Sequence, residues 1–263
     1  MQLELKGRHA LVCGASRGIG RAIAMELAAL GADVTALARS AEALDAMVAT
    51  LPKPHADQNH GCIAVDMAER DALAAAAAQL VAQHRVQILV HNSGGPPAGR
   101  ACEADPAAFE SAFAQHVVAG QVLLQAVLPG MREAGYGRLV NIISTSVKEP
   151  IPNLGVSNTV RAAVAGWAKT LAGELAADGI TVNNVLPGFT ETDRLASLIA
   201  GRASAQHTSE DAVSADMRAQ VPAARFGQPE EIAAVAAFLC TPAAAYVNGV
   251  SIAVDGGRTR SLS

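Results

Sequence analysis

The stretch LVCGASRGIGRAIA (residues 11–24) decides how this chain folds. Its three glycines, Gly14, Gly18 and Gly20, follow a short apolar run and precede a segment with helical periodicity. Glycines at such a junction let the backbone turn tightly and approach a pyrophosphate, whose charge the free N–H groups of a helix amino terminus favour. The spacing is G-x3-G-x-G rather than the commoner G-x-G-x-x-G, so the strand–loop–helix context carries the prediction of a dinucleotide site. A structural turn without a ligand is the alternative.

Outward from this stretch, short β-rich runs alternate with longer Ala-rich helical segments. Most of the short runs are almost continuously apolar, as in parallel strands covered on both faces. The alternation predicts a single α/β domain over residues 1–263, with a doubly wound (Rossmann) parallel seven-stranded sheet and helices on both faces. The expected strands are HALVC (9–13), DVTALA (33–38), GCIAV (61–65), VQILVH (86–91), RLVNIIS (138–144), ITVNNVL (180–186) and VSIAV (250–254).

Composition narrows the classes of function. The chain has 263 residues, 51% of them hydrophobic, which is enough for one large core. A net charge of −4, with no basic run interleaved with aromatics, argues against nucleic acid or an anionic membrane. No continuous apolar run reaches the roughly 20 residues of a membrane span and no signal-peptide pattern opens the chain, so we expect a cytosolic protein. Four cysteines without CxxC spacing predict buried thiols that pack as small hydrophobes, and we expect no metal site.

Residues 190–222 interrupt the alternation of strands and helices. This segment is polar, rich in small residues and lies between the last two expected strands. It follows the carboxyl end of a strand, where doubly wound folds bind ligands. We therefore expect a flap over the site, and a surface excursion without function is the alternative.

The end of the second expected strand indicates which dinucleotide binds. An NAD site tends to carry an acidic residue there to hold the ribose hydroxyls. Here Arg39 directly follows the strand, and Asp33 stands at its opposite end. Arg39 and Arg17 could instead pair with a 2′-phosphate through charge-assisted hydrogen bonds. This pattern predicts NADP(H), with two solvated surface arginines as the alternative.

Five segments resemble motifs of the short-chain dehydrogenase/reductase family. They are CGASRGIG (13–20), VDMAERDAL (65–73), LVHNSGG (89–95), ITVNNVLPGFTETD (180–193) and the tail GQPEEIAAVAAFLCTPAAAYVNGVSIAVDGG (227–257). The likeness spans roughly residues 5–257 and is nearest to 3-oxoacyl-acyl-carrier-protein reductases. Cys13, His91 and Ser93 depart from the residues usual in the family.

The resemblance implies a set of cofactor contacts. Asp66 would approach the adenine, Thr192 would meet the carboxamide of the nicotinamide, and Pro187–Gly188 would shape its pocket. The full set is Gly14, Ser16, Arg17, Gly18, Ile19, Gly20, Arg39, Asp66, Met67, Asn92, Ser93, Gly94, Arg161, Pro187, Gly188, Thr190 and Thr192.

The stretch ISTSVKEPIPNLGVSNTVR (143–161) departs from the family where the proton chemistry occurs. In the family a strand-end serine is followed thirteen residues later by a tyrosine, which gives its proton to the carbonyl oxygen, and four residues later by a lysine. Ser144 matches the serine, Ser157 falls at the tyrosine, Arg161 at the lysine, and His116 at an upstream asparagine. An aliphatic hydroxyl is a far weaker acid than a phenol, and a guanidinium keeps its proton.

Three substitutes for the missing acid remain open. Arg161 could stabilise an alkoxide electrostatically without giving up a proton. His116 or His91 could be the acid, because histidine titrates near neutrality, although a structural role is common for a lone histidine. Lys148 could point into the cleft, with a solvated loop lysine as the alternative. The two tyrosines of the chain stand in other motifs.

Two hypotheses follow from these residues. The first is an NADP(H)-dependent oxidoreductase that acts on a carbonyl/alcohol or acyl small molecule, with Ser144, Ser157, Arg161 and His116 at a non-standard catalytic site. The second is a catalytically inactive dinucleotide-binding sensor or scaffold, which the joint loss of tyrosine and lysine favours. The resemblance also implies a homotetramer, in which helices near 107–131 and 157–177 pair across subunits.

Overall fold

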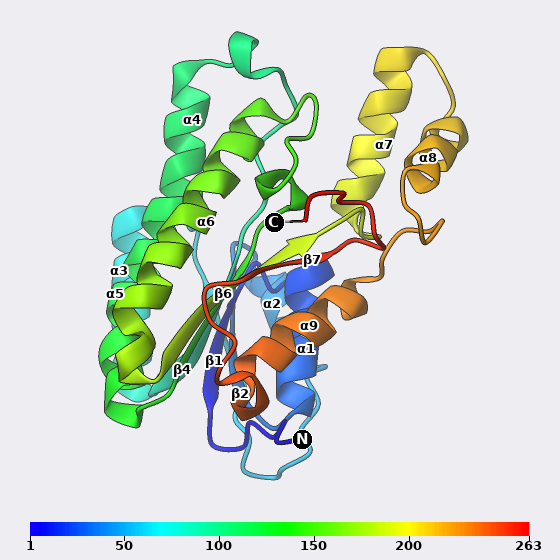
Figure 1. Ribbon diagram of the computed structural model, residues 1–263. Helices are drawn as coiled ribbons and strands as arrows, with labels where there is room; N and C mark the ends of the chain where they lie inside the picture. Colours follow the sequence, from blue (N-terminus) through cyan, green and yellow to red (C-terminus); the bar gives the residue numbers. More distant parts are fainter. Residues whose placement is uncertain (263) are drawn as a thin grey trace.

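Seven parallel strands form one sheet in the order β3-β2-β1-β4-β5-β6-β7 (Figure 1). This computed structural model describes residues 1–262. The strand order reverses between β1 and β4, the point outside whose carboxyl ends such sheets bind ligands. The predicted doubly wound α/β fold is confirmed.

Each strand lies within two residues of its predicted bounds. Ser144 falls two residues beyond the end of its strand, so it belongs to a loop rather than to the sheet. The strands are β1 (His9–Cys13), β2 (Asp33–Ala38), β3 (Gly61–Ala64), β4 (Val86–Asn92), β5 (Gly137–Ile142), β6 (Ile180–Pro187) and β7 (Ser251–Val254).

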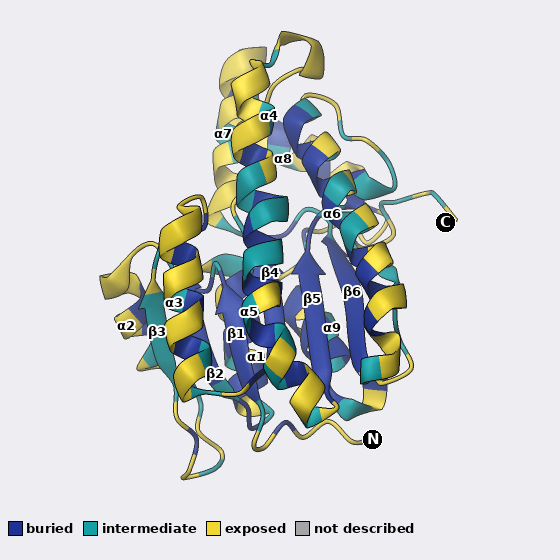
Figure 2. Cartoon of the chain, turned by 90° about the vertical axis from the view of Figure 1, so that its left-hand side faces the viewer, coloured by how far each residue is buried: buried dark blue, intermediate teal, exposed yellow. Residues whose placement is uncertain are grey.

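Helices cover the sheet on both faces, with α1 and α9 on one face and α3, α5 and α6 on the other (Figures 1 and 2). A π-helical turn, Ala114–Val118, joins α4 to α5. The helices are α1 (Gly18–Ala29), α2 (Ala41–Val48), α3 (Arg70–Gln83), α4 (Pro106–Phe113), α5 (Ala119–Ala134), α6 (Gly155–Leu175), α7 (Asp193–Gln206), α8 (Glu210–Ala219) and α9 (Pro229–Cys240).

Alternate residues of the central strand supply two separate cores. Ala10 and Val12 join the apolar cluster that includes α1 and α9, whereas Leu11 and Cys13 join the cluster beneath α3, α5 and α6. Successive side chains of a strand point to opposite faces, so a strand buried on both sides must be apolar throughout. Figure 2 shows the buried strands between the two helical layers.

The combined helix Pro106–Ala134 is long and apolar enough to cross a membrane by length and composition, with a mean hydropathy of 1.3 over its most apolar window. It is not a continuous apolar run, however, because Glu110, Gln121 and Gln125 interrupt it. In the fold, Leu123, Leu124 and Val127 of this helix are buried in the core against the sheet. Packing in a domain interior explains the same composition without a membrane.

The expectation of buried thiols holds for two of the four cysteines. Cys13 and Cys240 are buried, and burial raises the pKa of each to about 12. Cys62 is half-buried and Cys102 is exposed, so the expectation is wrong for Cys102.

Residues 190–222 contain two helices, α7 and α8, which stand beyond the carboxyl ends of the strands (Figure 1). Thr192 and Ser209 cap them, because each hydroxyl accepts a backbone N–H of the first turn. Apolar side chains spaced along both helices pack with Phe226, which follows them, in a small core made by Leu195, Ile199, Ala203, Val213, Met217 and Phe226. The polar composition of the segment concealed this narrow apolar stripe.

Candidate cofactor and catalytic site

The predicted cofactor residues lie along the carboxyl edge of the sheet, where parallel strands all end. They lie at the carboxyl ends of five strands or in the segments that directly follow them: β1 (Gly14, Ser16, Arg17 and the start of α1 with Gly18, Ile19, Gly20), β2 (Arg39), β3 (Asp66, Met67), β4 (Asn92, Ser93, Gly94) and β6 (Pro187, Gly188, Thr190, Thr192). Arg161 joins them from α6. This edge includes the reversal of strand order, where a dinucleotide fits best.

The glycine loop is shaped by close backbone contacts. Gly14 has φ +61°, and a methyl group on it would lie 2.6 Å from Asn92 Nδ2. A methyl group on Gly20 would collide with the carbonyl oxygen of Gly14. Asn92 Nδ2 donates to the carbonyl oxygen of Cys13 at 3.2 Å, which ties the end of β4 to this loop. Only glycine fits both positions, so the motif is required by packing as well as by any ligand.

The amino terminus of α1 is open to an anion. The side chain of Arg17, the residue that precedes α1, makes no capping hydrogen bond to the first turn. Its Nη1 instead pairs with Asp193 Oδ2 at 3.1 Å. A methyl group on Gly18 would lie 3.3 Å from Thr192 Cγ2, so the start of α7 lies against this loop. The free N–H groups and the helix dipole suit a pyrophosphate here.

The two arginines predicted to read the 2′-phosphate are held by weak contacts. Arg39 Nη1 lies 4.0 Å from Asp66 Oδ2, and the pair that Arg17 forms with Asp193 is also exposed. Exposed ion pairs contribute little to stability. Both guanidinium groups are therefore free to turn toward a phosphate at small cost.

Ser144 lies just beyond β5 with its hydroxyl partly committed. Its Oγ accepts the backbone N–H of Ser146 at 3.1 Å. Because a hydroxyl has one proton and two lone pairs, the Ser144 proton remains available to donate to a substrate oxygen. This geometry suits polarisation of a carbonyl.

Arg161, on α6, is 8% exposed. Its Nη1 donates to the carbonyl oxygens of Ile142 and Ile143, both at 3.1 Å, which fixes the side chain against the end of β5. Burial, together with the charge of Arg194, lowers the Arg161 pKa to about 10, so the group stays charged near neutral pH. Ser157, one turn earlier on α6, is also buried.

His116 does not provide the acid that its ordinary pKa suggests. Its Nδ1 lies 2.7 Å from Ser93 Oγ, and burial, with the charge of Arg161 second, lowers its pKa to about 3. Burial likewise lowers the His91 pKa to about 4. Both imidazoles are therefore neutral near pH 7 in the protein without ligand. Either histidine was a candidate acid because histidine ordinarily titrates near neutrality, and burial removes that property here. His116 instead links the loop after β4 to the π-helical turn.

These buried histidines predict acid sensitivity. The pKa is about 4 for His9, about 4 for His91 and about 3 for His116, against 6.5 ordinarily. Below pH 6.5 the unfolded chain therefore binds protons that the folded chain does not, so stability is complete above pH 6.5 and declines as the pH falls toward 4. Each histidine contributes about 1.4 kcal/mol per pH unit within that window.

Urea denaturation at pH 7.5 and pH 5 measures this effect. The free energy of unfolding should fall between pH 7.5 and pH 5. In His116→Asn this fall should be smaller, by about the contribution of one histidine. His207→Asn, at an exposed position after α7, is the matched control and should leave the loss unchanged. Equal losses in the parent chain and in His116→Asn would contradict the assignment.

The structure also contains a polar ladder that the sequence analysis missed. His91, Asn141, Asn184 and Ser251 are register partners on four adjacent strands. Hydrogen bonds of 3.3, 3.0 and 3.0 Å join their side chains in that order. The signal was present in the sequence, because polar residues in otherwise apolar strands need partners when buried. The ladder fixes the register of β4 to β7 below the site.

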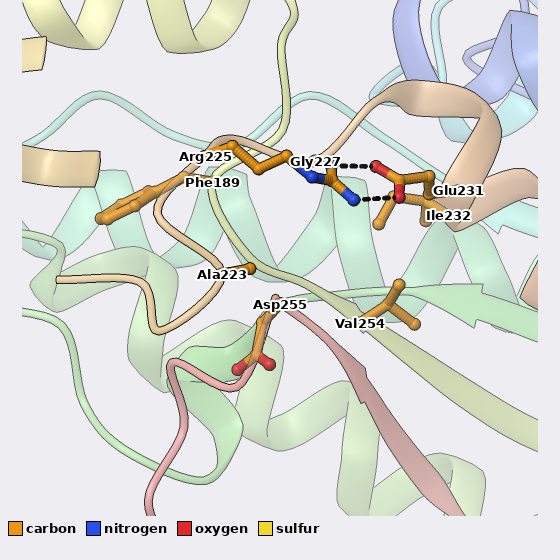
Figure 3. Close-up of a pocket in the computed structure, with 9 residues that line it drawn as sticks. Phe189, Ala223, Arg225, Gly227, Glu231, Ile232, Val254 and Asp255 are labelled. Carbon is orange, nitrogen blue, oxygen red and sulfur yellow. Dashed lines mark hydrogen bonds and ion pairs between the residues drawn. The ribbon is translucent and has the colours of Figure 1, made fainter. Parts of the chain in front are cut away.

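A cavity of about 100 Å³ lies beside this edge, between β7 and the start of α9 (Figure 3). Arg225 and Glu231 close one side of it through two hydrogen bonds of 2.6 Å, and this pairing lowers the Glu231 pKa to about 2. The cavity is far smaller than a dinucleotide requires, since ligand pockets measure about 300 to 1,000 Å³. Its ion pair joins the chain before α9 to the first turn of that helix.

Known proteins share the sequence pattern and the fold of this chain. The family profile described as Enoyl-(Acyl carrier protein) reductase matches residues 14–259. The chain belongs to this branch of the short-chain dehydrogenase/reductase family.

Residues 1–262 contain no cluster of three or more His, Cys, Asp or Glu side chains that could hold a metal ion.

Relatives within the family match this chain over nearly its whole length. The 3-oxoacyl-[acyl-carrier-protein] reductase FabG of Pseudomonas aeruginosa is 36% identical over 97% of this chain and 98% of its own. The NADPH-dependent reductase BacG of Bacillus subtilis is 29% identical over 97% and 99%. L-sorbose reductase from Gluconobacter frateurii, solved with NADPH and L-sorbose, superposes with a TM-score of 0.92 at 28% identity over all of both chains.

Proposed function

We propose that this member of the short-chain dehydrogenase/reductase family is an NADP(H)-dependent oxidoreductase acting on a carbonyl/alcohol pair through a non-standard catalytic site. The observation that carries the proposal is that Arg161 binds the backbone carbonyls of Ile142 and Ile143, directly before Ser144, at the end of β5 beside the cofactor edge. Relatives described as NADPH-dependent or solved with NADP or NADPH support the choice of cofactor. The free thiols of the described residues agree with a cytosolic location.

The residues of the cofactor edge would hold NADPH, which when bound would supply the hydride for reduction of a carbonyl carbon. The electron pair of the C=O bond moves to the oxygen, where the Ser144 hydroxyl donates a hydrogen bond and the positive charge of Arg161 stabilises the developing negative charge. A proton from water then completes the alcohol. Because Arg161 remains protonated, it stabilises the oxyanion without being the acid.

A catalytically inactive dinucleotide-binding protein is the second candidate, favoured by Ser157 and Arg161 at the tyrosine and lysine positions. A screen of NADPH oxidation against 3-oxoacyl thioesters, quinones and aldehydes, run beside an NADPH binding titration, separates the two. We expect turnover with a member of one class. Tight NADPH binding without turnover in any class would favour the second candidate.

The cofactor preference gives a sharper expectation. Arg39→Asp should weaken NADPH binding about 10- to 100-fold, because it removes a charge-assisted hydrogen bond and adds a repelling carboxylate, and should reverse the preference toward NADH. Arg85→Asp, at the opposite edge of the sheet, changes the net charge equally and should alter neither affinity. Calorimetric titration of both cofactors measures this. Equal NADPH and NADH affinities in the parent chain would remove the 2′-phosphate assignment.

We also propose a homotetramer, in which α6 and the helix formed by α4 and α5 pair across subunits. Ala162 and Gly166 of α6 are exposed and small, so two helix backbones could approach closely there. The apolar composition of Pro106–Ala134 is consistent with a second buried face. Light scattering at micromolar concentration should give the mass of four chains, and a monomer mass would contradict the assembly.

A further inference from the structure

Two guanidinium groups converge on the loop after β4. Arg161 reaches it from α6 and Arg194 from the first turn of α7. A methyl group built on Gly95 would lie 3.4 Å from Arg161 Nη2 and 3.8 Å from Arg194 Nη2. The two nitrogens therefore lie near one common point. A carboxylate there, with hydrogen bonds of about 2.9 Å to its oxygens, could bridge them.

Neither charge is balanced by an acid. Among residues 1–262, no ion pair includes Arg161 or Arg194. Arg161 Nη1 is held by backbone carbonyls alone, and Arg194 Nη2 donates to the carbonyl oxygen of Pro96 at 2.8 Å. The two positive charges repel each other: after burial, the charge of Arg194 is the second cause that lowers the Arg161 pKa.

Two acidic side chains on neighbouring elements already have partners. Asp193, adjacent to Arg194 in the chain, pairs with Arg17. Glu149 Oε1, in the loop that follows Ser144, accepts the backbone N–H groups of Arg260 and Ser261, both at 2.7 Å. A buried cation beside a second cation is unfavourable unless an anion joins them. The arrangement therefore suits a ligand that brings its own negative charge.

The position of the pair limits what that ligand can be. Arg161 Nη1 binds the carbonyl oxygen of Ile143, the residue immediately before Ser144. The arginine pair therefore lies on the same loop edge as the Ser144 hydroxyl, which the proposed function assigns to the reacting carbonyl. A planar carboxylate matches the fork of N–H donors that guanidinium groups present.

We propose that Arg161 and Arg194 form a carboxylate-binding site and that the substrate is a small oxo acid, with its carboxylate one or two carbons from the reacting carbonyl. This inference rests on the proposed function, since it assigns the substrate class of the same site. Arg194 is a substrate-binding residue, and α7 carries it over the cofactor edge. The position of α7 thereby gives the 190–222 segment a role in substrate selection.

Calorimetric titration of the NADP⁺-loaded protein with acetoacetate and with methyl acetoacetate tests the site without requiring turnover. Acetoacetate should bind about 10- to 100-fold more tightly than its ester, the value of a charge-assisted contact. Arg194→Gln should abolish that difference while changing NADPH affinity less than twofold, and Arg194→Lys should restore part of it. Arg85→Gln, which removes one positive charge at the far edge of the sheet, should preserve the full difference.

Other outcomes overturn the proposal. Equal or undetectable binding of acid and ester would remove the carboxylate site. Inorganic phosphate that competes better than acetoacetate would reassign the pair to a phosphate group. A large loss of NADPH affinity in Arg194→Gln would assign Arg194 to the cofactor instead. The test measures binding, so its result does not depend on turnover. A chain without turnover could still bind acetoacetate more tightly than the ester. A reductase of neutral ketones would show turnover without that difference in affinity.

Discussion

Ser144→Ala should reduce turnover about 100- to 1000-fold, which is the usual cost of losing one donor to a developing oxyanion. The Ser144 hydroxyl already accepts the Ser146 N–H, so its proton is the part available to a substrate oxygen. NADPH binding should remain intact, because the predicted cofactor contacts come from other side chains. Steady-state kinetics beside a calorimetric NADPH titration measures both effects on any substrate that the screen identifies.

Ser157→Ala is the matched control for this variant. Ser157 is buried at the tyrosine position, but its hydroxyl is too weak an acid to supply the proton. Its removal should cost much less turnover than the removal of Ser144. A native activity that survives Ser144→Ala unchanged would show that the catalytic assignment is wrong.

The double variant Ser157→Tyr with Arg161→Lys should raise turnover about 10²- to 10⁴-fold, the range that a positioned general acid contributes. Residues 157 and 161 lie one turn apart on α6, so the new phenol and ammonium would face the same site. The lysine would lower the phenol pKa as it does in the family. The measurement is the carbonyl screen repeated on the double variant and on each single variant, with circular dichroism to verify folding.

The outcomes separate the two candidate functions. Turnover that occurs only in the double variant would mean that the native chain binds a dinucleotide without catalysis. Native turnover that the double variant does not raise, in a folded protein that still binds NADPH, would mean that the native site has its own route for the proton. Each single variant should gain little, because the phenol and the cation act as a unit.

Much of this fold was determined by local sequence features. The near-continuous apolar runs marked all seven strands within two residues, because parallel strands covered on both faces admit few polar side chains. The glycines of the first loop were equally informative, since Gly14 and Gly20 have no room for a side chain. The cofactor residues that the family resemblance implies lie along one edge of the sheet, because parallel strands all end there.

Weaker local signals were missed. The helices α7 and α8 have a narrow apolar stripe within a polar segment, and only their packing on one another makes them evident. The ladder from His91 to Ser251 required the strand order before its members became neighbours. Arg194 attracted no attention in the sequence, because a single arginine after a helix cap resembles any solvated residue.

The sequence by itself therefore determined the α/β fold, the glycine loop, the expected NADP(H) preference and the loss of the tyrosine and lysine, since each depends on residue type at fixed spacing. Tertiary structure decided the charge states and the partnerships. Burial and the nearby charge of Arg161 lower the pKa of His116 to about 3, which removes the acid that its residue type suggested. Only folding brings Arg161 and Arg194, 33 positions apart, to the same glycine. Solvation and charge proximity are properties of three-dimensional surroundings, and a linear pattern does not specify them.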